Sequence, residues 1–180
     1  TEEQRDALRE ANDALLAWVR TNTELVPTAP LLDTRDEIED LLSSSTIDTI
    51  ATALEAGSPI IAEDRRIRMV AADLGVTSLS WTQPLLMKLR EDGVLDGKDY
   101  VSLLVKLRRQ RIGFVSAGSD ELLLATTMDN DLYDTLAEAI TDGRVDPRSL
   151  VPVASELACQ LWTQPQFVAE RERYFGQIFN

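Results

Sequence analysis

The stretch PIIAEDRRIRMVAADLGVTSLS, residues 59–80, decides the fold class of this chain. It opens with a short apolar run over residues 59–62, bounded by turn residues, which is typical of a buried parallel strand. A helical pattern follows as far as Gly75, and residues 76–80 form a second strand candidate. Helices that alternate with short apolar strands predict an α/β layer with parallel strands.

Helical patterns surround this stretch on both sides. Upstream, we expect an amphipathic helix over 2–21, a short strand at Leu25-Val26, a helix from Asp33 to about Leu42 and a helix over 47–54 that ends at Gly57. Downstream, we expect a helix from Pro84 to Gly93, a helix over 98–111, a third strand at 114–116 and helices after Gly118. The sequence therefore predicts an α/β domain over residues 1–124 and a helical C-terminal extension over residues 125–180.

Composition excludes several kinds of site. The chain has 180 residues, of which 44% are apolar and 27% charged, as in ordinary globular proteins. It holds no histidine, which excludes Ser-His-Asp triads and zinc sites with imidazole ligands. The single cysteine, Cys159, excludes an intramolecular disulfide framework, and its apolar neighbours favour a buried and inert thiol.

The sequence shows no signal for a membrane. No apolar run approaches the roughly 20 residues that a spanning helix needs. The sequence also shows no secretory signal peptide, which would be a charged segment followed by an apolar core. We therefore expect a cytoplasmic protein with no membrane partner.

The net charge of −13 is unevenly distributed along the chain. Residues 1–64 carry 4 basic and 15 acidic side chains, residues 65–111 carry 10 and 5, and residues 112–180 carry 4 and 11. Only the middle third would attract nucleic acid. That basic segment is either a docking surface or a set of helix faces whose charges are paired locally.

The candidate chemistry lies at the end of the first predicted strand. Glu63 and Asp64 follow that strand directly, and ligands of open parallel sheets bind beyond the carboxyl ends of the strands. These carboxylates are suitable ligands for a hard cation such as Mg²⁺. Alternatively, Asp64 caps the following helix by accepting a backbone N–H near Ile67. Asp48, on the preceding helix, is a second candidate ligand or a solvated residue of the first turn.

Two arginine clusters follow the candidate acids in the sequence. Arg65, Arg66 and Arg68 come directly after Asp64, and a second cluster ends the helix predicted over 98–111. Cations at a helix C-terminus complement its dipole, which is sufficient reason for the second cluster. Both clusters near one acidic site would instead suit a phosphate backbone that enters a metal centre.

Over residues 48–124 the chain resembles the later half of a PIN domain, the metal-dependent ribonuclease fold of many bacterial toxins, including those of toxin–antitoxin pairs, and of RNA-processing enzymes. The similar stretches are IDTIATALEAGSPIIAEDRRIRMVAADLGVTSLSW and, less specifically, LLMKLREDGVLDGKDYVSLLVKLRRQRIGFVSAGSDELL. The resemblance implies a PIN-like three-layer α/β fold with a short parallel sheet. PIN domains begin with a strand that carries the first catalytic aspartate, and the region before Asp48 shows no such strand.

The resemblance also implies roles for individual residues. Asp48 matches the family's helix acid, and Asp64, together with Glu63, matches its strand-end acid. These residues would bind Mg²⁺ or Mn²⁺, with Asp48 and Asp64 as the catalytic acids.

Two functions are consistent with this sequence. The first is a metal-dependent ribonuclease, or part of one, that hydrolyses RNA phosphodiesters while Arg65, Arg66 and Arg68 steer the phosphate. The second is a catalytically silent PIN-like module that binds a protein partner or a second copy of itself. The second function is motivated by the missing first acid, the net charge of −13 and the thin sheet.

Overall fold

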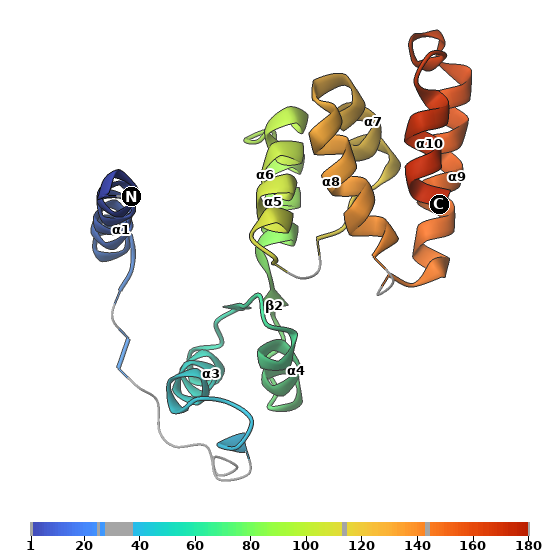
Figure 1. The fold of residues 1–180 in the computed structure, drawn as a ribbon. Coiled ribbons are helices and arrows are strands. Elements are labelled where there is room, and N and C mark those ends of the chain that lie inside the picture. Colours follow the sequence, from blue (N-terminus) through green and yellow to red (C-terminus); the bar gives the residue numbers. More distant parts are fainter. Residues whose placement is uncertain (1, 25, 28–37, 113–114, 143–144, 180) are drawn as a thin grey trace. The chain divides into compact units, whose positions relative to one another are not determined.

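The computed structural model describes the chain except for residues 1, 25, 28–37, 113–114, 143–144 and 180 (Figure 1). The described part is mostly helical and contains one parallel sheet of two strands. It divides into two compact units, residues 1–60 with 69–78 and residues 61–68 with 79–180. Among the described helices, none has the length and apolar character needed to cross a membrane.

The first unit contains the helices α1 (Glu2–Asn22) and α3 (Ser44–Ala56), both of which the sequence predicts. In α3, the Ser43 side chain accepts the backbone N–H of Thr46 at 3.3 Å, which caps the N-terminus. Gly57 ends the helix in the left-handed conformation, at a φ of 59° that L-residues rarely adopt.

Leu25 and residues 28–37 lie outside the described part. Where the chain is described, the predicted strand at Leu25-Val26 is wrong, because Val26 is not in a strand. The helix predicted from Asp33 to about Leu42 is wrong over residues 39–42, which form a turn and a bend instead.

The two strands are β1 (Ile60–Ile61) and β2 (Leu79–Ser80), joined through α4 (Arg65–Asp73). The N–H of Ile60 donates to the carbonyl of Ser78, and the N–H of Ala62 donates to the carbonyl of Ser80, both at 3.0 Å. These bonds advance in the same direction along both strands, so the pair is parallel. The parallel sheet is confirmed, and a three-layer arrangement remains a prediction.

The second unit contains three consecutive helix pairs. They are α5 (Thr82–Glu91) with α6 (Gly97–Arg109), α7 (Ser119–Met128) with α8 (Asn130–Thr141), and α9 (Pro147–Thr163) with α10 (Arg171–Phe179), with the short 3₁₀ helix η1 (Pro165–Phe167) between α9 and α10. Helix α8 contacts both α6 and α10, and α7 contacts α9, so each pair packs on the next (Figure 1). We call these six helices, residues 82–179, the helix array.

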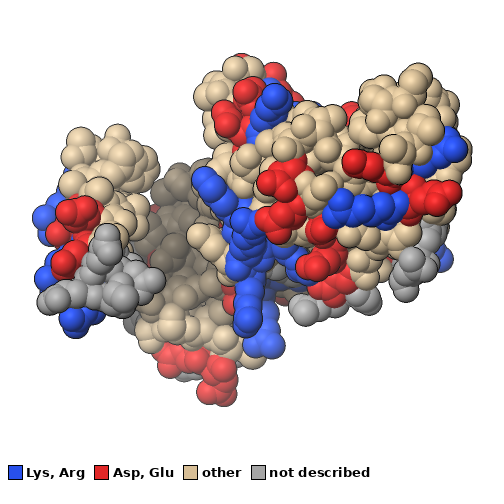
Figure 2. Space-filling model, turned by 45° about the horizontal axis from the view of Figure 1, so that its top comes forward, with Lys and Arg blue, Asp and Glu red and all other residues tan. Residues whose placement is uncertain are grey.

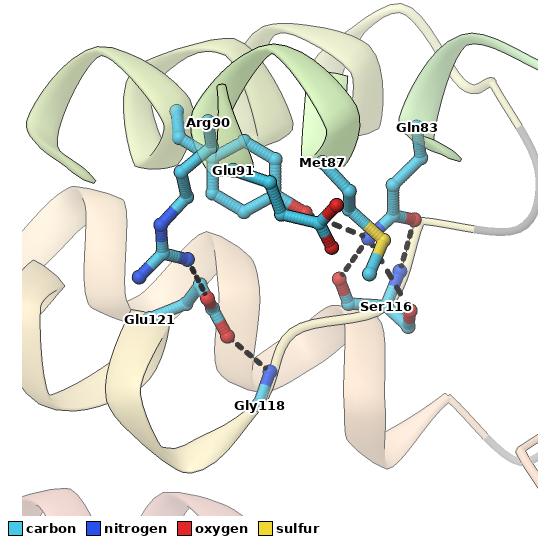
Figure 3. Close-up of a pocket in the computed structure, with 8 residues that line it drawn as sticks. Gln83, Met87, Arg90, Glu91, Ser116, Gly118 and Glu121 are labelled. Atoms are coloured by element: carbon cyan, nitrogen blue, oxygen red, sulfur yellow. Dashed lines mark hydrogen bonds and ion pairs between the residues drawn. The ribbon is translucent and has the colours of Figure 1, made fainter. Parts of the chain in front are cut away.

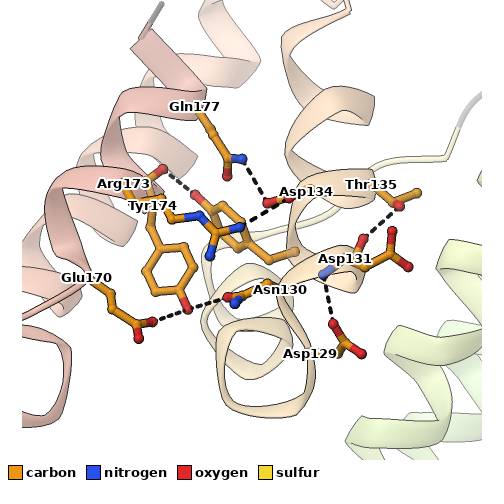
Figure 4. A network of polar contacts seen from close by, with 10 residues as sticks. Asp129, Asn130, Asp131, Asp134, Thr135, Glu170, Arg173, Tyr174 and Gln177 are labelled. Carbon is orange, nitrogen blue, oxygen red and sulfur yellow. Dashed lines mark hydrogen bonds and ion pairs between the residues drawn. The ribbon is translucent and has the colours of Figure 1, made fainter.

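One continuous apolar core runs through the helix array. Its fully buried members come from α6 to α10 and include Leu104, Leu122, Leu136, Leu157 and Leu161. The hydroxyl of Tyr133 donates to the carbonyl of Tyr174 at 2.5 Å inside this core, and the two rings meet edge to face (Figure 4). Polar side chains of α8 and α10 surround the tyrosines and bind one another, as Figure 4 shows for Arg173 and Asp134.

The predicted third strand is wrong where the structure describes it, because Val115 and Ser116 are not in a strand. The buried side chain of Gln83 takes the place of a neighbouring strand. Its Nε2 donates to the carbonyl of Ser116 at 2.6 Å, and its Oε1 accepts the N–H of Ser116 at 2.9 Å. Phe114 lies outside the described residues.

Two further predictions concern the C-terminal region. Cys159 is exposed rather than buried, because Leu157 and Leu161 occupy the core side of α9 and Cys159 lies away from it. The division between residues 1–124 and 125–180 stays a prediction, and its boundary falls inside α7.

Candidate functional site

The carboxyl ends of β1 and β2 carry the predicted strand-end acids, and we call residues 62–68 and 79–82 the sheet edge. Glu63 follows β1, and its Oε1 accepts the N–H of Thr82, the first residue of α5, at 2.8 Å. The N-cap residue of α5, Trp81, makes no side-chain cap hydrogen bond of its own. Glu63 therefore caps α5 from a distant part of the chain, where the helix dipole favours a negative charge.

The second oxygen of Glu63 is the unusual atom of the sheet edge. Glu63 Oε2 is buried and has no hydrogen-bond partner within the described part of the chain. The indole Nε1 of Trp81, the residue before Thr82, is also buried without such a partner. A buried polar atom without a partner costs free energy, so the sheet edge holds an acceptor and a donor that are open to a further polar group.

Asp64 caps the next helix, as the alternative interpretation of the sequence expects. Its Oδ1 accepts the N–H of Arg66, the second residue of α4, at 2.7 Å. The side chain is exposed, and the cap falls on Arg66 rather than near Ile67. Asp64 therefore has a structural role in this geometry, on a side chain that is exposed to solvent.

The three predicted arginines differ in their surroundings. Arg68 Nη1 donates to the carbonyls of Ala62 at 2.5 Å and Glu63 at 2.9 Å, and its guanidinium lies 4.7 Å from the Trp81 ring centroid. It thereby fastens the end of β1 to the start of α5. Arg65 and Arg66 are exposed in the first turn of α4, where the helix dipole disfavours cations.

Asp48 lies in the second turn of α3 and is half-buried. It belongs to the first compact unit, whereas Glu63 and Asp64 belong to the second. Its backbone carbonyl accepts the hydroxyl of Thr52 at 2.8 Å. The structure thus brings together Glu63, Asp64 and Arg68, and it places Asp48 in a separate unit.

The donor atoms at the sheet edge decide what kind of metal site they suit. Among the described residues, no three acidic, histidine or cysteine side chains form a group that could hold a metal ion. The carbonyls of Ala62 and Glu63 already accept from Arg68, whose charge would repel a cation. The described residues do not fit a two-metal centre. They fit at most one hard cation that takes Glu63 Oε2 as a ligand and keeps several water molecules.

A second feature begins one residue further along α5, and sequence reasoning missed it. A pocket of about 460 Å³ adjoins the buried Gln83, and we call it the Gln83 pocket (Figure 3). Its walls include Met87, Arg90 and Glu91 of α5, Tyr100 of α6 and Glu121 of α7. These residues are scattered over 39 positions with no motif, so no local pattern in the sequence marks the pocket.

Burial also shifts the acidity of the pocket's tyrosine. Burial raises the pKa of the Tyr100 phenol, and the Gln83 amide, 3.5 Å from its oxygen, opposes that rise. The Arg90 guanidinium lies 5.1 Å from the centroid of the Tyr100 ring. Tyr100 is therefore a protonated hydrogen-bond donor at neutral pH.

Comparison with known protein families gives a match in the N-terminal part of the chain. Residues 1–73 match the model of a family described as a PIN domain associated with the TPR-GreAB-C-PIN system. No curated protein and no solved structure matches the chain. The matched residues contain Asp48, Glu63 and Asp64 and end with α4. The match therefore confirms that this chain is similar to PIN domains, over residues 1–73.

Proposed function

We propose that the helix array is a protein-binding module that accompanies the PIN-like segment. The observation that carries this proposal is the packing of three consecutive helix pairs over one continuous core. Stacked helix pairs of this kind offer extended surfaces on which partner proteins bind. The matched family is described as associated with a system of several named parts, which also supports a role in an assembly.

Exposed apolar side chains favour two helices of the array, α5 and α9, as binding surfaces. The large ones on its helices are Leu85, Met87 and Leu89 of α5 and Val151 and Trp162 of α9. None of the described side chains of α6, α8 and α10 belongs to this class. Trp162 packs edge to face on Phe175, with the Arg171 guanidinium 5.3 Å from its ring centroid. Partly exposed tryptophan and arginine are enriched among residues that dominate protein–protein binding.

Charge on the array favours a protein over an RNA backbone as partner. Several of the array's basic side chains are paired with acids, as in Arg108 with Asp142, Arg109 with Asp131, and Arg173 with Asp134. Figure 2 shows blue and red side chains interspersed over the helices at the right of the view, and a group of blue side chains near its centre. Where acids and bases alternate, the surface lacks the continuous basic field on which binding to a phosphate backbone depends.

Site-specific photo-crosslinking in cells tests the proposed function. A photoreactive amino acid at Leu85 or at Val151 should yield a discrete adduct with one protein. The same amino acid at Glu138 of α8 or at Arg173 of α10 serves as the matched control, since both positions are exposed. Equal adducts from all four positions, or no adduct from any, would contradict the proposal.

One observation favours a second candidate, the metal-dependent ribonuclease. Glu63 Oε2 is buried without a partner in the described part of the chain, inside the segment that matches a PIN family. A bound Mg²⁺ or Mn²⁺ would supply an activated water and stabilise charge on the phosphate. In this candidate function, Glu63 is the metal ligand and the adjacent Asp64 is the catalytic acid. The structure gives no support for Asp48 as a further ligand, because it belongs to the other compact unit. The exposed Arg65 and Arg66 steer the RNA phosphate, and Arg68 holds the strand end.

RNA cleavage by matched variants tests this second candidate. The parent should cleave unstructured RNA in Mn²⁺, and Glu63→Gln should abolish cleavage, because the neutral amide binds the cation poorly while its oxygen still accepts from Thr82. Asp64→Asn should reduce cleavage with an unchanged melting temperature, since asparagine is an equally good cap. Absence of cleavage by the parent, or full activity of Glu63→Gln, would exclude this role for Glu63.

A further inference from the structure

The Gln83 pocket lies on α5, the same helix that carries the exposed Leu85 and Leu89. Its volume of about 460 Å³ falls within the range of about 300–1,000 Å³ that is typical of ligand pockets. One wall is fixed firmly, because the Gln83 side chain holds the backbone of Ser116 through both its N–H and its carbonyl. A fixed pocket beside exposed apolar side chains is suited to anchor a side chain of a partner.

Two charged groups of the pocket satisfy each other. The Arg90 guanidinium forms an ion pair with Oε1 of Glu121. Glu121 Oε2 accepts the N–H of Gly118 at 2.8 Å, at the N-terminus of α7 (Figure 3). Neither charge is therefore available to a ligand without a loss elsewhere.

Glu91 contributes one further negative charge to the pocket. Within the part of the chain that the structure describes, no hydrogen bond or ion pair involves its carboxylate, which points into the pocket between Arg90 and Met87 (Figure 3). It is the last residue of α5, where the helix dipole disfavours an anion. A cation bound here would offset that unfavourable interaction.

The remaining walls suit an apolar stem that carries such a cation. Met87 is 47% exposed, and its thioether adapts readily to different shapes. The Tyr100 ring adds an apolar wall, and the Arg90 guanidinium, 5.1 Å from its centroid, is offset by its ion pair with Glu121. Lysine and arginine combine these two properties, since their methylene stems pack on apolar surfaces while the charged head remains polar.

We propose that the Gln83 pocket receives a lysine or arginine side chain of the partner protein, with Glu91 as its counter-ion. This inference rests on the proposed function, because it names the chemistry of the partner that the array binds. The net charge of −13 supports it, since a strongly acidic protein attracts and steers a basic partner.

Methyl NMR of the full chain tests the pocket directly. The chain has three methionines, and only Met87 lines the pocket, so Met69 and Met128 are internal controls. The probes are the capped tripeptides acetyl-Gly-Arg-Gly-amide, acetyl-Gly-Lys-Gly-amide and acetyl-Gly-Glu-Gly-amide. We expect the first two to shift the Met87 methyl signal in a saturable way and the third to leave it unchanged.

Matched variants distinguish the pocket from general attraction to an acidic chain. Glu91→Gln should weaken binding of the arginine peptide at least fivefold. Glu156→Gln, which removes the same charge from an exposed position on α9, should change it less than twofold. Both variants should keep the parent's melting temperature, because both side chains are exposed.

Two results would overturn the inference: an unmoved Met87 signal, or equal binding by Glu91→Gln and the parent. Either result leaves the crosslinking from Leu85 and Val151 unaffected if the array still binds a protein by other contacts. Loss of that crosslinking would instead contradict the proposed function itself.

Discussion

Polar side chains that bond to the backbone order the sheet edge, whereas a buried apolar core orders the helix array. At the sheet edge, Glu63, Asp64 and Arg68 each bind backbone groups of a strand end or a helix N-terminus. In the array, Leu136 and Tyr133 are completely buried among apolar neighbours. The comparison teaches that the residues that the sequence predicts as a metal site hold the local backbone in this structure, whereas the closely packed core lies in the array.

The largest loss of stability is expected from a substitution in the core of the array. Leu136→Ala removes a fully buried side chain from α8 and leaves a cavity, which should lower the free energy of unfolding by about 2–5 kcal/mol. Leu85→Ala, at a position 40% exposed, is the control and should cost far less. Urea denaturation measures both. Similar losses would mean that the array does not have a closely packed core.

A smaller loss of stability is expected at Ser116, whose backbone is bonded by the Gln83 side chain instead of a neighbouring strand. Gln83→Ala leaves the N–H and the carbonyl of Ser116 without their partner, which should cost about 2 kcal/mol. The control is Gln177→Ala, since this exposed glutamine makes a single bond to Asp134. Urea denaturation should show a clear loss for the first variant only. An unchanged midpoint for Gln83→Ala would contradict the role given to this amide.

The tyrosines of the core predict a loss of stability in alkali. Burial raises the pKa of Tyr133, and burial with the neighbouring Glu170 raises the pKa of Tyr174 to about 12. The unfolded value is about 10. Between pH 10 and pH 12 the unfolded chain loses phenol protons that the folded chain keeps, so stability falls as the pH rises through this window.

Denaturant midpoints at pH 9 and pH 11 measure this alkaline loss, and Tyr174→Phe should make it smaller. Tyrosinate absorbance provides an independent check, since the folded protein should show little of it at pH 10. Ionisation of about half the phenols at pH 10 without unfolding, as for exposed tyrosines, would contradict their buried environment.

The smallest effect concerns the cap at the sheet edge. Asp64→Ala removes the acceptor of the Arg66 N–H and should lower stability by about 1 kcal/mol, whereas Asp64→Asn should be nearly neutral. Amide hydrogen exchange of Arg66 should rise in the alanine variant alone. Equal exchange in both variants would show that the side chain does not cap α4.

Local signals explain which parts of the fold could be predicted from the sequence. Ser43 and Gly57 stand directly at the ends of α3, and the apolar run before Glu63 marks β1, so both elements follow from neighbouring residues. The Asp64 cap spans two residues and was one of the alternatives. Such contacts are visible in a single sequence because both partners lie within one turn.

Contacts between distant segments explain what could not be predicted. Glu63 caps a helix that begins 19 residues later, and Gln83 binds the backbone 33 residues away. Neither pairing leaves a periodic pattern in the sequence. The apolar run at residues 114–116 therefore indicated a strand, although a glutamine side chain supplies the hydrogen bonds of Ser116 that a neighbouring strand would make.

Thermal unfolding of the full chain with and without millimolar Mn²⁺, beside Glu63→Gln, tests the central claim most directly. A cation that binds only the folded state would stabilise it by about 2.7 kcal/mol at a hundredfold excess over its dissociation constant. If the sheet-edge acids serve the backbone and the array carries the function, Mn²⁺ should leave both melting temperatures unchanged. A rise of several degrees in the parent that Glu63→Gln abolishes would contradict this account and establish a metal site at the sheet edge.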